Sequence, residues 1–187
     1  IRMMTGHSSD VTKVAWHGNA TLFASGGDDK TVRLWDLRTP ECVRVLQGCA
    51  SAVSALSISS LGNLLVAGTE TGHIYLYELS TSKLLAILYG HQEPVYSLSF
   101  ASDGLHVISG SRDASVRLWD TLPAFDGLGK AGQSDLTRGQ VILRPKQSFF
   151  TKDTPVYAVG CTASDLVYAG GPCPARKFAM HVSNDRM

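Results

Sequence analysis

The sequence predicts an all-β fold built from repeated four-stranded units. Three observations lead to that prediction: a gapless internal repeat, short apolar runs between turn residues, and no sustained helical periodicity. The dipeptide Gly6-His7 recurs at steps of 42 residues as Gly48-Cys49 and Gly90-His91. A second landmark keeps the same step: Trp35-Asp36, Tyr77-Glu78 and Trp119-Asp120. Three gapless copies are hard to obtain by chance, so one structural unit repeats along the chain.

Each copy contains four short apolar runs that predict strands. In the first copy they are Val11 to Trp16, Leu22 to Ser25, Thr31 to Asp36 and Cys42 to Leu46. These runs are rich in Val, Leu, Thr and aromatic residues and are separated by Gly, Asn, Asp and Pro, as is typical of antiparallel strands. Four strands at a period of about 42 residues are typical of the blades of a β-propeller.

The repeats resemble WD repeats in four features: Gly-His at the start, Ser-Gly before the third strand, an Asp in the following turn, and Trp-Asp at the end of the third strand. The resemblance is strong over residues 1–120 and weak over 145–171. It implies a WD-repeat β-propeller fragment with three four-stranded blades, part of a fourth and one strand of a preceding blade. We place the partial propeller at 1–171, with blades at about 7–47, 49–89, 91–150 and, in part, 152–171, followed by a loosely ordered tail at 172–187.

Both ends of the repeat array are irregular. Ile1–Thr5 is in register with Val43–Gln47, so we expect it to be the outer strand of a blade that the sequence lacks, and the sequence to lack the N-terminal part of a longer protein. Near the other end, Thr154–Val159 resembles Glu93–Leu98 but follows it by 61 residues instead of 42. The excess falls at 121–144, which is rich in glycine and predicts a long exposed loop. Further strands are expected at Pro145–Phe150, Val156–Cys161 and Leu166–Ala169.

The resemblance also implies two hydrogen-bonded tetrads of buried side chains. Matched position by position, they are His7, Ser25, Asp29 and Trp35 in the first copy, and His91, Ser109, Asp113 and Trp119 in the third. A carboxylate only accepts, an imidazole both donates and accepts, a hydroxyl relays and an indole N–H only donates, so these four types form a chain. Each bond contributes about 1 kcal/mol net to stability.

The second copy replaces all four tetrad residues together, by Cys49, Ala67, Thr71 and Tyr77. A half-satisfied buried network costs about 1–3 kcal/mol for each orphaned group, so simultaneous loss is what that penalty predicts. We expect this blade to be held by packing alone.

Composition narrows the function classes. The net charge of +1 gives no electrostatic reason for nucleic-acid or membrane binding. The four cysteines form no C-x-x-C pair, so a zinc site or disulfide framework is not expected. A Ser, His and Asp in one repeat suggest a hydrolase, but the same trio occurs twice and neither Ser lies in a strand-to-helix nucleophile elbow. We therefore expect no catalytic residue, no metal, no cofactor and no small-molecule substrate.

A propeller of this kind is expected to bind partners at one rim, where side chains vary on a repeated frame. The turns after the second strands and the facing loops bring six residues to equivalent apices: Asp10, Asp28, Ala52, Glu70, Pro94 and Arg112. The alternative is that these are solvated turn residues without a partner.

Two features outside the common repeat indicate which WD-repeat family the sequence resembles. Leu118-Trp119-Asp120 opens an enlarged loop, and Thr151-Lys152-Asp153-Thr154-Pro155-Val156 follows it. These features resemble the C-terminal propeller of the fifth TBP-associated factors, a family of TFIID subunits with a related copy in SAGA. The resemblance implies a nuclear, non-enzymatic scaffold that supports assembly of RNA polymerase II initiation complexes beside histone-fold TBP-associated factors. The alternative is a WD-repeat adaptor of another complex: SAGA, a ubiquitin-ligase substrate receptor or a splicing factor.

Overall fold

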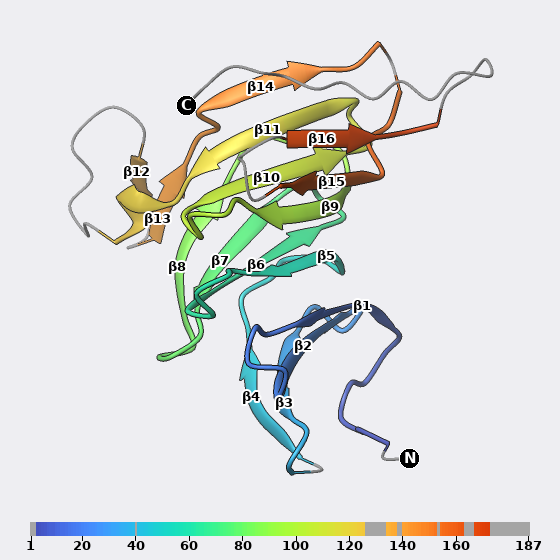
Figure 1. The fold of residues 1–187 in the computed structure, drawn as a ribbon, viewed down its shortest axis with the longest axis vertical. Helices are drawn as coiled ribbons and strands as arrows, with labels where there is room; N and C mark the ends of the chain where they lie inside the picture. The colour runs from blue at the N-terminus through green and yellow to red at the C-terminus, as the bar shows by residue number, and fades with distance from the viewer. Residues whose placement is uncertain are drawn as a thin grey trace.

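The computed structural model describes residues 3–39, 41–125, 134–137, 140–152, 154–162 and 167–172. The described residues form sixteen strands and one short 3-10 helix, η1 (Leu122–Ala124), so the all-β prediction is confirmed. The strands are arranged as sheets that follow one another in a fan, with the chain running from the β1 sheet to the β16 sheet (Figure 1). None of the helical segments described is long and apolar enough to cross a membrane.

Three antiparallel sheets correspond to the three predicted blades. Blade 1 consists of β1 (Val11–Trp16), β2 (Leu22–Gly27), β3 (Val32–Asp36) and β4 (Cys42–Leu46). Blade 2 consists of β5 (Val53–Ile58), β6 (Leu64–Thr69), β7 (Ile74–Glu78) and β8 (Lys83–Leu88). Blade 3 consists of β9 (Val95–Phe100), β10 (His106–Ser111), β11 (Ser115–Asp120) and β14 (Gln147–Phe150). The two predicted strands of the fourth unit are β15 (Ala158–Cys161) and β16 (Val167–Gly170), which pair antiparallel.

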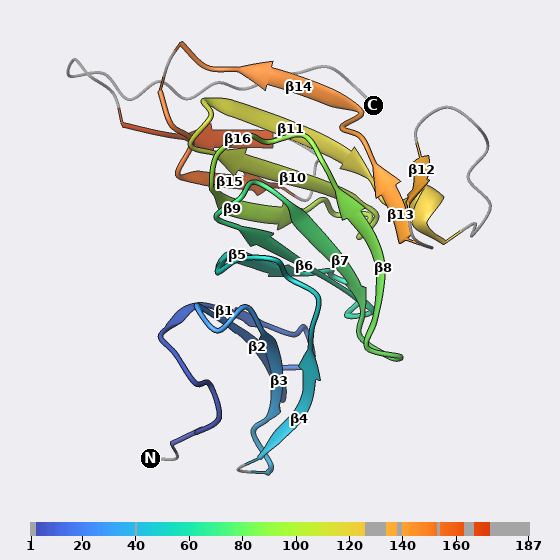
Figure 2. The same cartoon turned by 180° about the vertical axis from the view of Figure 1, so that it is seen from behind.

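The glycine of each Ser-Gly dipeptide, or of its Ala-Gly equivalent, lets the next blade approach the second strand of the preceding one. A Cβ added at Gly26 would lie 2.5 Å from Val53 Cγ1, and one at Gly68 would lie 2.8 Å from Val95 Cγ1. Gly110 repeats the contact with Val156, at 2.6 Å. These distances are shorter than any real Cβ contact, so the repeated glycine is required for the blades to stack (Figure 2).

Hydroxyl groups on the inner strands bridge successive blades. Thr12 Oγ1 on β1 donates to the backbone carbonyl oxygens of Gly26 and Val53. Ser54 Oγ, at the same position of blade 2, donates to Val95 O at 2.6 Å. Because each hydroxyl reaches a backbone carbonyl of the following blade, the sheets are held in register by hydrogen bonds as well as by packing.

The prediction of a long exposed loop at 121–144 was wrong for part of that range. The described residues there include η1, β12 (Ser134–Thr137) and β13 (Gln140–Leu143). β13 pairs parallel with β8, so it extends the sheet of blade 2 to six strands. The physical reason is the apolar run Val141-Ile142-Leu143, because burying these side chains against the open edge of β8 lowers the free energy of the folded chain. Residues 126–133 and 138–139 lie outside the described residues.

The two terminal predictions are only partly covered by the structure. Met3–Thr5 lies outside strands, and no described residue pairs with it as a sheet neighbour; Ile1 and Arg2 lie outside the described residues. Of the predicted tail at 172–187, Pro172 alone is described, and that residue is not in a strand.

Candidate functional site

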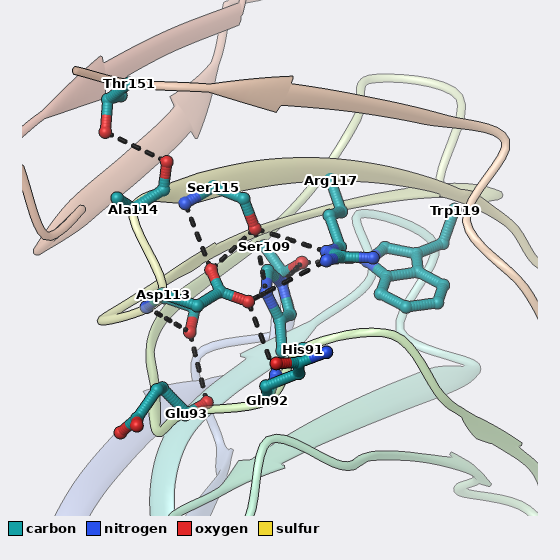
Figure 3. A network of polar contacts seen from close by, with 11 residues as sticks. His91, Gln92, Glu93, Ser109, Asp113, Ala114, Ser115, Arg117, Trp119 and Thr151 are labelled. Carbon is teal, nitrogen blue, oxygen red and sulfur yellow. Dashed lines mark hydrogen bonds and ion pairs between the residues drawn. The ribbon is translucent and has the colours of Figure 1, made fainter. Parts of the chain in front are cut away.

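The four tetrad residues of blade 3 meet as predicted. His91 Nδ1 lies 2.9 Å from Asp113 Oδ2, and His91 Nε2 lies 2.6 Å from Ser109 Oγ. Trp119 Nε1 donates to the same Ser109 hydroxyl at 2.8 Å. The four side chains come from the loop before β9, from β10, from the β10–β11 turn and from β11, so the chain of bonds joins that loop to the two central strands of the blade (Figure 3).

The protonation states follow from burial. Burial lowers the pKa of His91, so its imidazole is neutral at pH 7. Burial alone would raise the pKa of Asp113, but hydrogen bonds from His91 and Ser115 outweigh it and hold that pKa well below its usual range. The Nδ1–H of His91 therefore donates to an ionised Asp113, and Nε2 accepts from the Ser109 hydroxyl, which in turn accepts from Trp119.

Blade 1 repeats the geometry. His7 Nδ1 lies 2.8 Å from Asp29 Oδ2, while Ser25 Oγ lies 2.7 Å from His7 Nε2 and accepts from Trp35 Nε1, also at 2.7 Å. Burial acts to raise the pKa of Asp29, yet the hydrogen bonds from Thr31, His7 and Ser8 hold it well below its usual range. Both tetrads that the resemblance implied are thus present as closed, buried hydrogen-bond chains.

Sequence reasoning missed a fifth position in these networks, on the third strand side of the turn. Thr31 donates to Asp29 Oδ1 at 2.7 Å in blade 1, and Ser115 donates to Asp113 Oδ1 at 2.6 Å in blade 3. Arg117 adds a donor from its Nε to Ser115 Oγ at 3.2 Å. The signal was available, because a hydroxyl residue occurs at the same repeat position in both blades and His73 replaces it in blade 2.

The prediction that packing alone holds blade 2 was wrong. The Tyr77 hydroxyl donates to Gln47 O at 3.2 Å and lies 3.4 Å from Cys49 Sγ, so the thiol is the donor in that second contact. Burial raises the pKa of Cys49 to about 11, which keeps the thiol protonated for this role. A second tyrosine, Tyr75, accepts from the backbone N–H of Ala50 at 3.1 Å. Tyrosine hydroxyls thus replace part of the tetrad, and the Thr71 hydroxyl, at the aspartate position, lies 3.0 Å from Ser51 Oγ and 3.2 Å from His73 Nδ1.

The six predicted rim residues lie in pairs, one pair to each blade. A backbone hydrogen bond joins each pair: Asp28 N to Asp10 O at 2.9 Å, Glu70 N to Ala52 O at 3.1 Å, and Arg112 N to Pro94 O at 3.0 Å. The frame is therefore identical in the three blades. The side chains that it presents run from two carboxylates in blade 1, through one in blade 2, to a guanidinium in blade 3, and those of Asp10, Asp28, Glu70 and Arg112 are exposed.

The turns next to these pairs also share one backbone conformation. Lys30, Gly72 and Ala114, each 42 residues apart, have φ of +62°, +83° and +60°. Lys and Ala in this left-handed region cost more than Gly does, so the hairpin geometry is imposed by the surrounding network and not by local preference. The rim residues therefore project from turns of one shared backbone conformation.

Side chains away from the rim bear on two other kinds of site, a metal site and a small-molecule pocket. The described residues contain no group of three or more His, Cys, Asp or Glu side chains that could hold a metal ion. A largely apolar hollow of about 380 Å³ lies between blades 1 and 2, lined in part by His17, Phe23 and Arg44. Its Arg44 guanidinium donates to Leu79 O at 2.7 Å and to Ser82 Oγ at 3.2 Å, so this cation is already hydrogen-bonded to acceptors of the neighbouring blade.

Comparison with known proteins agrees with this architecture. The family model described as "WD domain, G-beta repeat" matches residues 1–36, 40–78 and 82–120. Over 36 residues the chain is 47% identical to the probable cytosolic iron-sulfur protein assembly protein Ciao1 of Anopheles gambiae, a match that covers 19% of this chain and 11% of that protein. Over 45 residues it is 42% identical to polyadenylation factor subunit 2 of Neurospora crassa, covering 24% of this chain and 7% of that protein.

A third relative is the nuclear distribution protein PAC1 of Scheffersomyces stipitis, 41% identical over 51 residues, which covers 24% of this chain and 10% of that protein. The chain thus matches only a small part of the length of each relative. What these relatives share with it is the repeat unit itself. The three family-model matches cover more than half of the sequence, and each contains the first three strands of one of the three blades: the chain belongs to the WD-repeat family.

Proposed function

We propose that this chain is part of a non-enzymatic subunit of TFIID that acts in the nucleus, where it binds histone-fold TBP-associated factors and supports assembly of RNA polymerase II initiation complexes. WD-repeat domains act as protein-interaction scaffolds, and this coarser function follows from the family. The repeated backbone frame of the rim, with different charges in each blade, is the observation that supports a protein-binding surface, and the resemblance of Thr151–Val156 and of the enlarged loop before it carries the TFIID assignment.

The buried state of both serines supports a structural role for the Ser, His and Asp trio. Ser25 is 4% exposed and Ser109 is fully buried, so neither hydroxyl is accessible to a substrate in solution. Each hydroxyl is also bonded to both a histidine and a tryptophan within its own blade.

The segment that carries the TFIID resemblance has a defined place in the fold. Thr151 Oγ1 donates to Ala114 O at 2.9 Å, and Val156 is the residue that packs on Gly110 of blade 3. These contacts set the entry of the fourth sheet. The long insertion before this segment adds a strand to blade 2, which is an elaboration beyond the four-stranded repeat.

Affinity purification of the tagged full-length protein from nuclear extract tests the proposal. We expect histone-fold TBP-associated factors and TATA-binding protein to co-purify. The double charge reversal Asp28→Lys, Arg112→Glu is expected to reduce that recovery without unfolding the protein. Its matched control is Glu41→Lys, Lys83→Glu, which reverses two exposed charges away from the rim pairs.

Each other result of the affinity purification leads to a specific conclusion about the protein. Recovery of SAGA subunits, ubiquitin-ligase subunits or splicing factors without TATA-binding protein would replace the TFIID assignment by that complex. Equal recovery with the rim variant and the control would show that the rim pairs do not make the contact.

A further inference from the structure

The outer strands of the three blades differ sharply in burial, although they occupy equivalent places. In β4 of blade 1, Val43 is 50% exposed and Val45 is 40% exposed, and only Leu46 is buried; in β14 of blade 3, all four residues are exposed. In β8 of blade 2, by contrast, Ala86, Ile87 and Leu88 are buried. The difference coincides with β13, which lies against β8 in both views of the ribbon (Figures 1 and 2).

The pairing of β13 with β8 has the features of strand addition to a sheet edge. Val141 aligns with Ala86, Ile142 with Ile87 and Leu143 with Leu88, all parallel. The backbone N–H of Tyr89 donates to Leu143 O at 3.0 Å. Val141 and Leu143 are 9% and 2% exposed and belong to the same apolar cluster as Ala86, Leu88 and Ala124.

The added strand pairs less extensively with β8 than β7 does. It pairs with β8 over only three aligned residues, whereas β7 and β8 align over five positions. Parallel pairs are slightly weaker per residue than antiparallel ones. The advantage of β13 over a free peptide is therefore mainly its high effective concentration, since it belongs to the same chain.

We propose that the outer edge of β8 is a docking edge for an extended apolar peptide segment, and that Gln140–Leu143 is its resident occupant in the same chain. The edge takes a strand in parallel register: main-chain hydrogen bonds to β8 give affinity, and apolar side chains at alternate positions, as at Val141 and Leu143, give selectivity. A protein partner presenting such a segment competes with β13 for this edge.

The test first detaches β13 from the outer edge of β8 and then adds a peptide that can pair with that edge. In the full-length protein, Val141→Asp with Leu143→Asp should detach β13, because two carboxylates would have to be buried. We expect the Tyr89 amide to lose protection from hydrogen exchange. A fluorescent peptide of residues 140–146, Gln-Val-Ile-Leu-Arg-Pro-Lys, should then bind the variant about tenfold or more tighter than it binds the unmodified protein, since the competitor in the same chain is gone. Bound peptide should restore Tyr89 protection.

Controls make each result decisive. The variant Gln147→Asp, Ser148→Asp adds the same two charges to the exposed strand β14 and should leave both peptide affinity and Tyr89 exchange unchanged. A peptide with Asp at its second and fourth positions should not bind. The proposal is overturned if the freed variant does not bind the peptide, if the Asp-substituted peptide binds equally well, or if Tyr89 stays protected without β13.

A milder variant covers the case in which the first one does not fold. Val141→Ala with Leu143→Ala removes apolar contacts without burying charge, and the same two readouts apply. If this variant is also unfolded, β13 is an obligatory part of the core and the docking edge does not exist.

Discussion

Blades 2 and 3 are neighbours built on one sequence frame, yet they are held by different chemistry. Blade 3 uses a chain of four polar side chains that runs from the loop before β9 to the third strand. Blade 2 has none of those four and instead contains a large share of the fully buried apolar side chains of the described residues. These include Leu64, Leu65, Ile74, Leu76 and Leu88.

The comparison teaches that a buried polar network is gained or lost as a unit. In blade 2, the position of Ser109 is Ala67, and the position of Trp119 is Tyr77, whose hydroxyl bonds to a backbone carbonyl instead. Every buried polar atom named in either blade has a partner. Each blade is thus self-consistent, whereas a mixture of the two would orphan at least one donor or acceptor.

The largest effect is expected from breaking the blade 3 network at its centre. Ser109→Ala removes the one group that bonds both His91 and Trp119. We expect stability to fall by about 2–4 kcal/mol, since each orphaned buried group costs about 1–3 kcal/mol. Native-state hydrogen exchange of the β10 and β11 amides measures the loss, because repeat units open locally.

Two further variants sharpen that result. Ser148→Ala on the exposed strand β14 controls for loss of a hydroxyl and should change stability by less than about 0.5 kcal/mol. The fourfold exchange His91→Cys, Ser109→Ala, Asp113→Thr, Trp119→Tyr gives blade 3 the residues of blade 2. It should cost less than the sum of its single changes. Additive costs would show that the four residues do not act as a unit.

The same contrast explains which parts of the fold could be predicted from the sequence. The blades were predictable because the apolar runs and polar landmarks lie within one repeat and recur at one spacing, and both tetrads were implied by the resemblance of those landmarks to WD repeats. The pairing of Val141 with Ala86 was not, because nothing local in a short apolar run specifies which open edge it joins. The bonds of Tyr77 were missed because that residue was weighed only as the loss of a tryptophan.

For the candidate binding surface, the positions of the residues were predictable from the sequence, but their partner was not. The rim pairs of Asp28 with Asp10 and Arg112 with Pro94 were predictable from spacing, since turn positions repeat with the strands. The repeated backbone does not specify which partner binds those side chains, because the backbone hydrogen bonds that position them are the same in every blade. Charge reversal and purification, not geometry, therefore decide the function of the rim.

An effect of intermediate size on the stability of blade 3 is expected at acid pH. The pKa of His91 is lowered by burial below its ordinary value of 6.5, so the unfolded chain binds more protons there and the native state is favoured above that pH. As pH falls below about 6.5, blade 3 loses up to about 1.4 kcal/mol for each pH unit per proton taken up by the unfolded state. Loss of the ionised Asp113 adds to this only below its ordinary value of 3.8.

Hydrogen exchange of β10 and β6 amides between pH 7.5 and 5.5, corrected for intrinsic rates, measures this difference. The amides of β10 should lose more protection than those of β6, because His91 is buried in the blade 3 network, whereas His73 of blade 2, whose pKa burial also lowers, is only half-buried. Cys49 and Tyr77 have raised pKa values and stay protonated throughout. Replacing the blade 3 tetrad by the residues of blade 2 should abolish the pH dependence. Parallel loss in β6 and β10 would contradict the assignment to His91.

The smallest effect tests whether the hydrogen bonds of blade 2 contribute at all. Tyr77→Phe keeps the buried ring and removes only the hydroxyl that bonds Gln47 O and Cys49 Sγ. We expect a loss of about 0.5–1.5 kcal/mol, the net worth of one such bond, measured by exchange of the β7 amides. The control is Tyr168→Phe on β16, where 41% of the side chain is exposed and the change should be neutral. If Tyr77→Phe is equally neutral, the two hydrogen bonds of Tyr77 only replace bonds to water and add nothing net to the stability of blade 2.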